Sequence, residues 1–320
     1  MTMARDVLLQ TEHLKKYFQT SAGELHAVDD INFSIAKGTT LGVVGESGCG
    51  KSTLGRVVLH LLESTDGKIT YKGEDITRVS RKRLRELRNE MQIIFQDPFA
   101  SLNPRMSVKT IISEPLENAG MPKGQRTEKV KELMDTVGLA ERLGDSFPHE
   151  LDGGRRQRIG VARAIAMNPE FIVCDEPVSA LDVSIQAQII NLLQDLQEER
   201  NLTYMFISHD LSVVKYLSHQ IMVMYLGQTV EWSETEDLFA RPLHPYTQAL
   251  LLAVPIPKVG EKPKRIILKG EIVSPINPKP GCRFAPRCIY ATEKCHEPQE
   301  LRELAPGHFV SCCRAEEINK

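Results

Sequence analysis

The stretch Gly45-Glu-Ser-Gly-Cys-Gly-Lys-Ser-Thr53 fits the pattern G-x-x-x-x-G-K-[ST] of a phosphate-binding loop. Apolar residues 40–44 precede it as a predicted buried strand, and apolar residues at helical spacing follow from Leu54. Residues with little side chain let backbone N–H groups surround a polyphosphate, and the helix start adds partial positive charge. We expect Lys51 to reach the β and γ phosphates and the Ser52 hydroxyl to bind Mg²⁺. Strand, loop and helix together predict a nucleotide-phosphate site.

Composition limits the class of protein. A chain of 320 residues suggests two domains, or one large domain with an appendage. Lysine and arginine number 40 against 42 aspartates and glutamates, a net charge of -2, which argues against a general nucleic-acid-binding protein. No apolar run approaches the roughly 18 residues that span a bilayer, and the N-terminus has no signal-peptide core. We therefore expect a cytosolic protein that reaches a membrane only through partners.

Two predicted strands of an α/β core end in polar residues. The apolar segment Met91–Phe95 ends before Gln96, a residue suited to orient water or a metal ligand. Phe171–Cys174 is a second buried strand, and it ends in the adjacent carboxylates Asp175 and Glu176. In a chain with a phosphate-binding loop, we expect Asp175 to hold Mg²⁺ through water and Glu176 to polarise the attacking water.

A helical insertion is predicted between these strands. Residues 99–168 show helical periodicity and no strand signal. Within them, Leu151–Arg155 precedes a helix that Asp152 is suited to cap, with glycines that leave the N-terminal amides open. Farther along, Thr203–Ile207 is a predicted strand that ends before His209, which fits either a γ-phosphate contact or a cap of the next helix.

In this order the segments resemble the nucleotide-binding subunit of an ABC transporter. The resemblance covers residues 7 to about 240 and implies an α/β P-loop NTPase (RecA-like) core with an antiparallel β subdomain and a helical subdomain at about 97–168. Tyr17, which by pattern alone is a half-buried strand aromatic, then matches the residue that stacks on adenine. Ser179–Asp182 matches the D-loop. The residues that the resemblance assigns to the ATP site are Tyr17, Gly45, Glu46, Ser47, Gly48, Cys49, Gly50, Lys51, Ser52, Thr53, Gln96, Asp152, Gly153, Gly154, Asp175, Glu176 and His209. The residues it assigns to Mg²⁺ are Ser52, Gln96 and Asp175.

The C-terminal part, residues 241–320, narrows the resemblance. Arg241–Leu251 and Gly281–Cys288 are similar to the C-terminal extension of oligopeptide and dipeptide permease ATPases. Gln96–Met106 is similar to the F-type rather than the D-type subunit of that family. The resemblance implies a heterodimer with a D-type ATPase, two transmembrane permease subunits and an extracellular peptide-binding protein. It places the chain at the cytoplasmic face of a prokaryotic membrane, without nucleic acid.

Three other functions fit parts of the pattern. Nickel importers share much of this architecture. Soluble ABC ATPases that act on ribosomes or DNA usually carry two ATPase units or long coiled-coil insertions, which this chain lacks. A regulatory subunit with vestigial ATP hydrolysis is disfavoured by the intact Glu176 and His209.

By the same resemblance, Leu151–Arg155 is the signature motif of the family, and it departs from the family pattern Leu-Ser-Gly-Gly-Gln. This chain has Leu151-Asp-Gly-Gly-Arg155, so a carboxylate replaces the serine that donates a hydrogen bond to the γ-phosphate in the family. The signature serves the partner's ATP, where Asp152 would meet like charge. We therefore expect asymmetry: the site built on Lys51, Glu176 and His209 hydrolyses ATP, and the site completed by Asp152 is impaired. In the simpler alternative, Asp152 only caps its helix and both sites work.

Five of the seven cysteines lie in the last 40 residues. Disulfides are not expected in a reducing compartment, and little apolar sequence is available for a core, so a metal-stapled module is predicted. The candidate ligands are Cys282, Cys288, Cys295 and Cys312. Spacing does not choose between zinc and an iron–sulfur cluster, but the resemblance implies a [4Fe–4S] cluster, with Cys312 rather than Cys313 as the fourth ligand. Free thiols are the alternative. Cys49 and Cys174 are expected to pack in the core.

Overall fold

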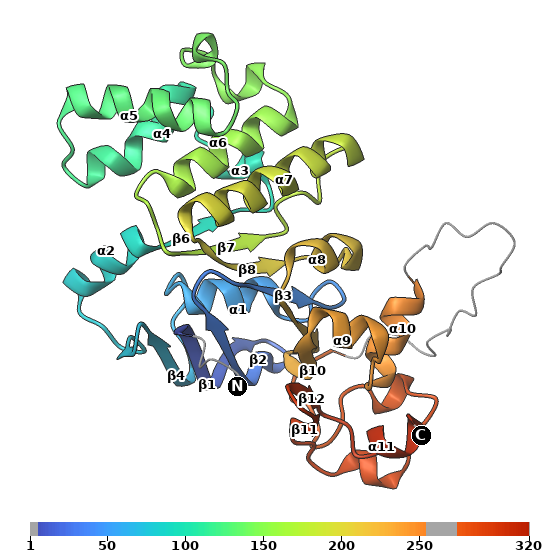
Figure 1. Ribbon diagram of the computed structural model, residues 1–320. Coiled ribbons are helices and arrows are strands. Elements are labelled where there is room, and N and C mark those ends of the chain that lie inside the picture. Colours follow the sequence, from blue (N-terminus) through green and yellow to red (C-terminus); the bar gives the residue numbers. More distant parts are fainter. Residues whose placement is uncertain (1–5, 254–273, 320) are drawn as a thin grey trace, which may run out of the picture. The chain divides into compact units, whose positions relative to one another are not determined.

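The computed structural model describes residues 6–253 and 274–319, which belong to two compact units (Figure 1). Unit 1 is assigned residues 1–78 and 207–320, and unit 2 residues 79–206. Unit 2 is thus an insertion within the sequence of unit 1. Residues beyond 240 are grouped with unit 1, and the predicted domain boundary at residue 240 stays a prediction.

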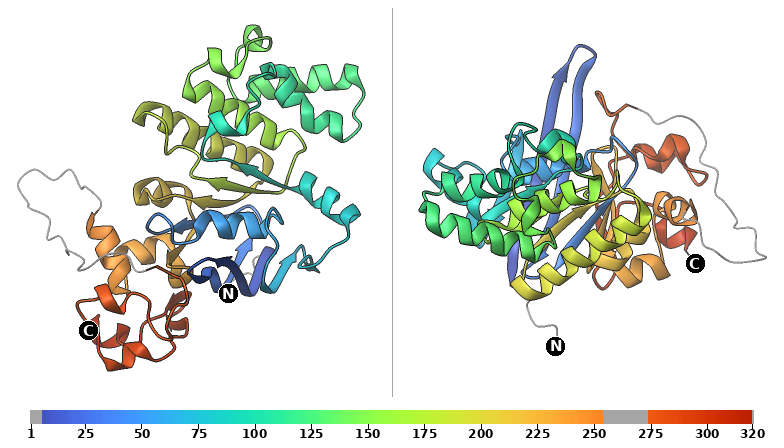
Figure 2. Two further views of the ribbon diagram at one scale, coloured as in Figure 1. Left: turned by 180° about the vertical axis from the view of Figure 1, so that it is seen from behind. Right: turned by 90° about the horizontal axis from the view of Figure 1, so that it is seen from above.

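Unit 1 contains an antiparallel sheet in the order β2-β1-β4-β5. Its strands are β1 (Val7–Thr20), β2 (Gly23–Ala36), β4 (Asp66–Tyr71) and β5 (Glu74–Asp75). β1 and β2 form the long blue hairpin in the right-hand view of Figure 2. This hairpin is longer than the short strands that the sequence predicts. Register shifts between Thr11 and Tyr17 absorb the residues that break the apolar alternation.

A second set of strands in unit 1 carries the phosphate-binding loop. β3 pairs parallel with β9, and β9, β10, β12 and β11 continue from it as antiparallel neighbours. All five residues of β3 are buried, as expected for a strand covered on both faces. The strands are β3 (Thr40–Val44), β9 (Gln220–Tyr225), β10 (Gln228–Glu234), β11 (Arg302–Ala305) and β12 (His308–Val310). The helices of unit 1 are α1 (Lys51–Val58), α8 (Leu211–Leu217), α9 (Thr235–Ala240), α10 (Pro245–Ala253), α11 (Ala315–Ile318), and the 3₁₀ turns η3 (Ala285–Arg287) and η4 (Glu293–His296).

Unit 2 combines three strands with a group of helices. Its strands follow the order β8-β7-β6, and β6 and β7 pair in parallel. They are β6 (Met91–Ile94), β7 (Phe171–Asp175) and β8 (Thr203–Ile207). The helices are α2 (Arg81–Glu90), α3 (Pro98–Ser101), α4 (Val108–Asn118), α5 (Lys123–Thr136), α6 (Gly153–Ile165), α7 (Val183–Arg200), and the 3₁₀ turns η1 (Glu141–Leu143) and η2 (Pro148–Glu150). No strand falls between β6 and β7, as the helical periodicity predicts.

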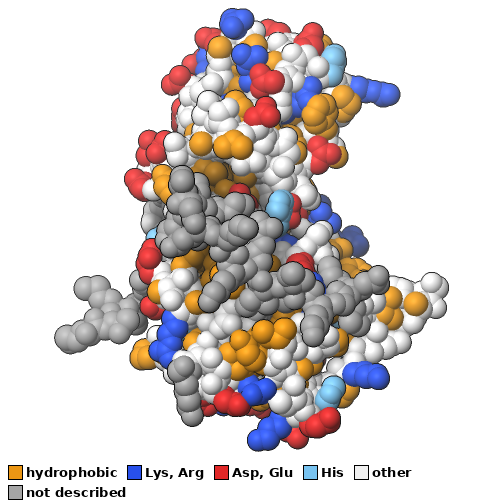
Figure 3. All heavy atoms as spheres, turned by 90° about the vertical axis from the view of Figure 1, so that its right-hand side faces the viewer, with side chains coloured by type: hydrophobic (Ala, Val, Ile, Leu, Met, Phe, Trp, Pro, Cys, Tyr) orange, Lys and Arg blue, Asp and Glu red, His pale blue; other side chains and the backbone are white. Residues whose placement is uncertain are grey.

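Two features bear on whether the chain meets a membrane or a nucleic acid directly: the apolar length of its helices and the distribution of charge on its surface. Within residues 6–253 and 274–319, no helix combines the length and apolar composition needed to cross a bilayer. Basic and acidic side chains are interspersed on this face (Figure 3), in line with the balanced charge of the sequence.

Candidate functional site

The predicted phosphate-binding loop joins the end of β3 to the start of α1. Gly50 is the N-cap of α1 with φ 104°. A Cβ there would lie 2.0 Å from the carbonyl oxygen of Ala27, so only glycine fits. Lys51 is 4% exposed, and its ammonium donates to the backbone carbonyls of Gly45 (2.8 Å) and Glu46 (3.0 Å). The lysine is thus held within the loop, at a helix start that favours anions.

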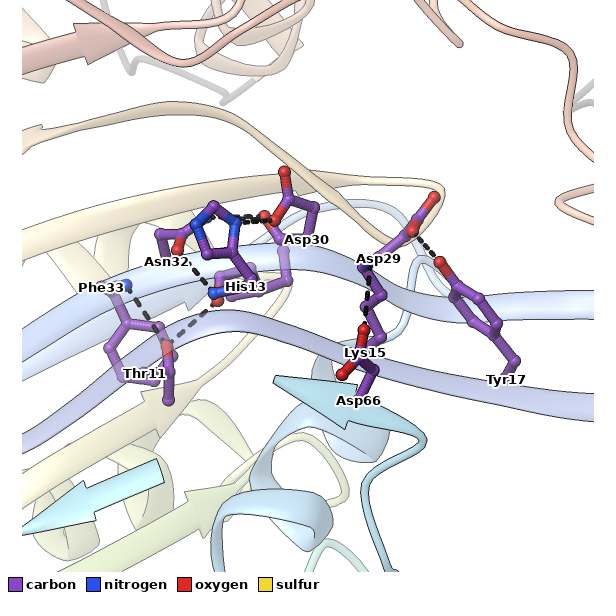
Figure 4. A network of polar contacts seen from close by, with 10 residues as sticks. Thr11, His13, Lys15, Tyr17, Asp29, Asp30, Asn32, Phe33 and Asp66 are labelled. Carbon is purple, nitrogen blue, oxygen red and sulfur yellow. Dashed lines mark hydrogen bonds and ion pairs between the residues drawn. The ribbon is translucent and has the colours of Figure 1, made fainter. Parts of the chain in front are cut away.

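Tyr17 lies on the same unit, opposite His26 in the β1–β2 pairing. The two rings stack, with centroids 3.8 Å apart and planes at 20°. The Tyr17 hydroxyl donates a hydrogen bond to Asp29 (Figure 4). Burial and this contact raise the pKa of Tyr17 above its ordinary value. His26 covers one face of the ring, so a base can stack only on the other.

His209 follows β8 at the loop that leads to α8. The N–H of Ser208 donates to the carbonyl of Val43, at 3.2 Å, on the strand that enters the phosphate-binding loop. His209 therefore lies beside that strand end. The residue that caps α8 is Asp210, whose side chain accepts a hydrogen bond from the N–H of Ser212. The alternative of a capping histidine is wrong, because the shorter carboxylate at the next position reaches the amide instead.

Gln96 and the two predicted acids lie together in unit 2. Because β6 and β7 are parallel neighbours, the residues that follow them emerge at one edge. Nε2 of Gln96 donates a hydrogen bond of 2.9 Å to Oε2 of Glu176. Asp175 is 1% exposed at the end of β7. Glu176 has φ 47°, a left-handed conformation that strains a residue with a side chain and is common at functional sites.

The departure in the signature has a clear structural role. Asp152 is the N-cap of α6, as the sequence predicts, and its Oδ1 accepts from the N–H of Arg155 at 2.8 Å. Its Oδ2 lies 3.2 Å from the Arg155 guanidinium. A Cβ on Gly154 would lie 2.6 Å from Ile185, and one on Gly153 would lie 3.0 Å from Leu181 in the predicted D-loop. The start of α6 is therefore packed against the segment after β7.

The tail cysteines line one small hollow in unit 1. All seven cysteines of the chain are free thiols, and Cys49 and Cys174 are buried as predicted. The cysteines around the hollow are Cys282, Cys288, Cys295, Cys312 and Cys313. Burial, with Cys312, Cys295 and Cys288 close by, raises the pKa of Cys282 to about 12. In the described part of the chain, no three His, Cys, Asp or Glu side chains are arranged to hold one metal ion.

The sequence does not predict that the extension touches the phosphate-binding loop. The Tyr246 hydroxyl accepts a hydrogen bond from the N–H of Glu46 at 2.8 Å. The Arg287 guanidinium donates to both carboxylate oxygens of Glu46, at 2.7 and 3.1 Å. Arg283 pairs with Asp29, the partner of Tyr17. Sequence spacing does not predict contacts between residues so far apart. The signal that the sequence offers is the presence of Arg283 and Arg287 beside Cys282 and Cys288.

A phosphate-binding loop between a strand and a helix, with a second strand that ends in two acids, defines the class as a P-loop NTPase. The family model for ABC transporters matches residues 28–179, and the model described as the oligopeptide/dipeptide transporter C-terminal region matches residues 230–295. Together with relatives that are at least 50% identical over almost the whole chain, these matches show that the chain belongs to the ATP-binding subunits of ABC transporters, enzymes that couple ATP hydrolysis to transport.

Similar proteins cover almost the whole chain. The oligopeptide transport ATP-binding protein AppF of Bacillus subtilis (strain 168) is 52% identical, over 98% of this chain and 99% of its own. OppF of the same organism is 50% identical, over 97% of each chain. The solved structure of cbiO1 from Clostridium perfringens, part of the ABC transporter complex cbiONQ, is 30% identical with a TM-score of 0.66, over 73% of this chain and 91% of its own.

Proposed function

We propose that this chain is the F-type ATPase of an importer for oligopeptides or dipeptides. The observation that carries the proposal is the presence, in one chain, of an ABC ATPase core and the C-terminal region named for oligopeptide/dipeptide transporters. The names of the relatives, which describe oligopeptide transport, support peptide as the cargo. In this proposal the chain works at the cytoplasmic face of the membrane, with two permease subunits and an extracellular binding protein.

The roles within the ATP site follow from side-chain chemistry. The loop Gly45–Thr53 binds the phosphates through its backbone N–H groups and Lys51, and Tyr17 stacks on adenine. Glu176 polarises the attacking water, and His209 contacts the γ-phosphate. The hydrogen bond from Gln96 orients the Glu176 carboxylate before ATP arrives.

The donors proposed for Mg²⁺ suit a hard cation. Ser52, Gln96 and Asp175 offer hydroxyl, amide and carboxylate oxygens, the ligand types that Mg²⁺ prefers. Asp175 is the last residue of β7 and is buried, so its carboxylate has a fixed position directly before Glu176. When bound, Mg²⁺ neutralises charge on the β- and γ-phosphates.

The heterodimer is proposed to have two unequal ATP sites. Each ATP lies between one subunit's loop and the other's signature, so Asp152 acts on the partner's nucleotide. The site built on Lys51 and Glu176 hydrolyses, and the site completed by Asp152 is impaired by like charge. The ion pair between Asp152 and Arg155 reduces that repulsion without restoring a hydroxyl donor.

The test is to change the catalytic carboxylate separately in each subunit of the purified complex. Glu176→Gln in this chain is expected to abolish turnover, whereas the equivalent change in the partner leaves most of it. A loss of about half from each change would show two working sites and overturn the asymmetry. Glu198→Gln, an exposed glutamate on α7, is the matched control.

Cargo is tested with the complex reconstituted in liposomes together with its binding protein. Hydrolysis that rises with oligopeptide and not with Ni²⁺ supports the proposal. Stimulation by Ni²⁺ alone would assign a metal importer instead. Purification of the chain with ribosomes or DNA, without membrane proteins, would assign a soluble ABC ATPase.

We also propose that the tail binds a [4Fe–4S] cluster through Cys282, Cys288, Cys295 and Cys312. The thiols line a common hollow, and a [4Fe–4S] cluster takes four cysteine thiolates as its ligands. The test is iron, sulfide and zinc content after anaerobic purification. Cys312→Ser is expected to lose the iron and Cys313→Ser to keep it. Stoichiometric zinc would assign the alternative metal, and a metal-free chain would leave free thiols.

A further inference from the structure

Two arginines from one short segment of the extension reach residues of the proposed ATP site. The segment Cys282–Cys288 contains both Arg283 and Arg287, whose side chains are 7% and 9% exposed. A buried guanidinium is costly unless it is paired, so each must have a defined partner. Both partners are acids on the nucleotide side of unit 1.

Arg287 holds the first variable residue of the phosphate-binding loop. Both Glu46 carboxylate oxygens accept its hydrogen bonds, in the two-pronged geometry that fixes orientation best. Arg287 also donates to the Tyr225 hydroxyl at 3.3 Å. The N–H of Glu46 donates to Tyr246, and its carbonyl accepts from Lys51 at 3.0 Å. Glu46 is thus fixed by its side chain and its backbone, and it links the extension to the phosphate-binding lysine.

Arg283 acts on Tyr17, the residue proposed to stack on adenine. It pairs with Asp29 and donates to the backbone carbonyl of Leu226. The other oxygen of Asp29 accepts from the Tyr17 hydroxyl (Figure 4). Burial disfavours the Asp29 carboxylate, but the contacts from Tyr17, Arg283 and His26 outweigh it and hold its pKa below the usual value. Asp29 is therefore a charged bridge between Arg283 and the stacking tyrosine.

We propose that the C-terminal extension positions the ATP site, with Arg287 fixing the phosphate-binding loop through Glu46 and Arg283 fixing Tyr17 through Asp29. This inference rests on the ATP contacts proposed above for Lys51 and Tyr17. The two arginines are positioning residues, because each acts through a carboxylate. The extension thereby contributes to nucleotide affinity.

The test compares two probes that share phosphates but differ in the base: Mg-ATP and Mg-tripolyphosphate, bound to the full-length chain. Arg287→Ala frees the loop and leaves Glu46 unpaired beside the phosphates, so both dissociation constants are expected to rise about tenfold. Arg283→Ala loosens Tyr17 through Asp29, so the constant for Mg-ATP is expected to rise while that for Mg-tripolyphosphate is unchanged. Removing Arg287 in a Glu46→Ala background is expected to have little further effect, because the group it acts through is gone.

Controls separate this inference from the site assignment and from simple misfolding. Arg302→Ala removes an arginine of the same extension that pairs with Glu316, and it is expected to leave both constants unchanged. Arg287→Lys, which keeps the charge, is expected to recover part of the affinity.

If Lys51→Ala and Tyr17→Ala weaken Mg-ATP binding while the Arg283 and Arg287 variants do not, this inference alone is overturned. It is also overturned if both arginine variants weaken the two probes equally and in step with a lower melting temperature. If Lys51→Ala and Tyr17→Ala bind Mg-ATP normally, the site assignment fails and this inference fails with it.

Discussion

Nε2 of Gln96 lies 2.9 Å from Oε2 of Glu176 and donates a hydrogen bond to it. The two residues are 80 positions apart, and the parallel pairing of β6 with β7 brings them to the same strand edge. A neutral amide on the carboxylate fixes its rotamer without neutralising it. The base proposed to polarise water is thus oriented by Gln96, which is also a proposed ligand of Mg²⁺.

Gln96→Ala is expected to lower kcat about tenfold or more while the dissociation constant for Mg-ATP changes little, because carboxylate and metal are misplaced but the loop is intact. The measurement is single-turnover hydrolysis together with nucleotide binding. Gln92→Ala is the control, because Gln92 lies on β6 and its side-chain amide donates to the backbone carbonyl of Arg88 in α2. Equal losses from both variants would mean that the strand, and not the amide, is responsible.

The elements that carry the site could be predicted because each depends on neighbours in the chain. The loop at Gly45–Thr53, the acids after Phe171–Cys174 and the cap at Asp152 all combine a local pattern with a local structure. The length of the β1–β2 hairpin was not predictable, because register shifts hide the alternation on which strand prediction relies.

The contact between Arg287 and Glu46 could not be predicted for a different reason. The partners lie 241 residues apart. The chain has 40 lysines and arginines and 42 acids, so charge alone permits very many pairings. Only the fold of the extension selects this one. Similarly, that Asp210 rather than His209 caps α8 depends on which side chain reaches the amide of Ser212.

Gly50→Ala is expected to destroy nucleotide binding and to lower stability, because the new Cβ would clash with the Ala27 carbonyl in a left-handed conformation. Gly160→Ala is the matched control. Gly160 lies within α6, and a Cβ there would meet no heavy atom within 4 Å. Alanine at Gly160 is expected to stabilise the chain by about 0.5–1 kcal/mol. Thermal unfolding and nucleotide binding of the two variants check this contrast, and similar behaviour would contradict it.

His244 is expected to make stability depend on acid pH. It is 1% exposed; Nδ1 accepts from the N–H of Tyr246 at 3.0 Å, and Nε2 has no partner among the described residues. Burial lowers its pKa to about 4, although the nearby Glu231 opposes this. As the pH falls, the His244 side chain therefore becomes protonated near pH 6.5 in the unfolded chain but only near pH 4 in the folded chain.

Stability is thus unaffected by His244 above pH 6.5 and falls as the pH drops from 6.5 towards 4, by up to about 3 kcal/mol. His244→Asn keeps an acceptor for Tyr246 and is expected to flatten this slope in chemical unfolding measured across that range. His296→Asn, an exposed histidine of the same unit, is the control. An unchanged slope in His244→Asn would show that other groups cause the acid sensitivity.

Substitutions at Asp152 can distinguish its role as a helix cap from its proposed role in the partner's ATP site. Its side chain caps α6 and pairs with Arg155, both close to the helix start where a γ-phosphate is expected in the closed heterodimer. Asp152→Ala should lower the free energy of unfolding by about 1 kcal/mol, whereas Asp152→Ser, which is also a good cap, should leave it nearly unchanged. Stability therefore does not distinguish serine from aspartate, and hydrolysis does.

Asp152→Ser with Arg155→Gln removes the like charge and restores a hydroxyl donor, so turnover per complex is expected to rise by up to about twofold as the second site begins to work. If turnover and nucleotide occupancy stay the same, capping is the whole function of Asp152 and the two sites are equivalent.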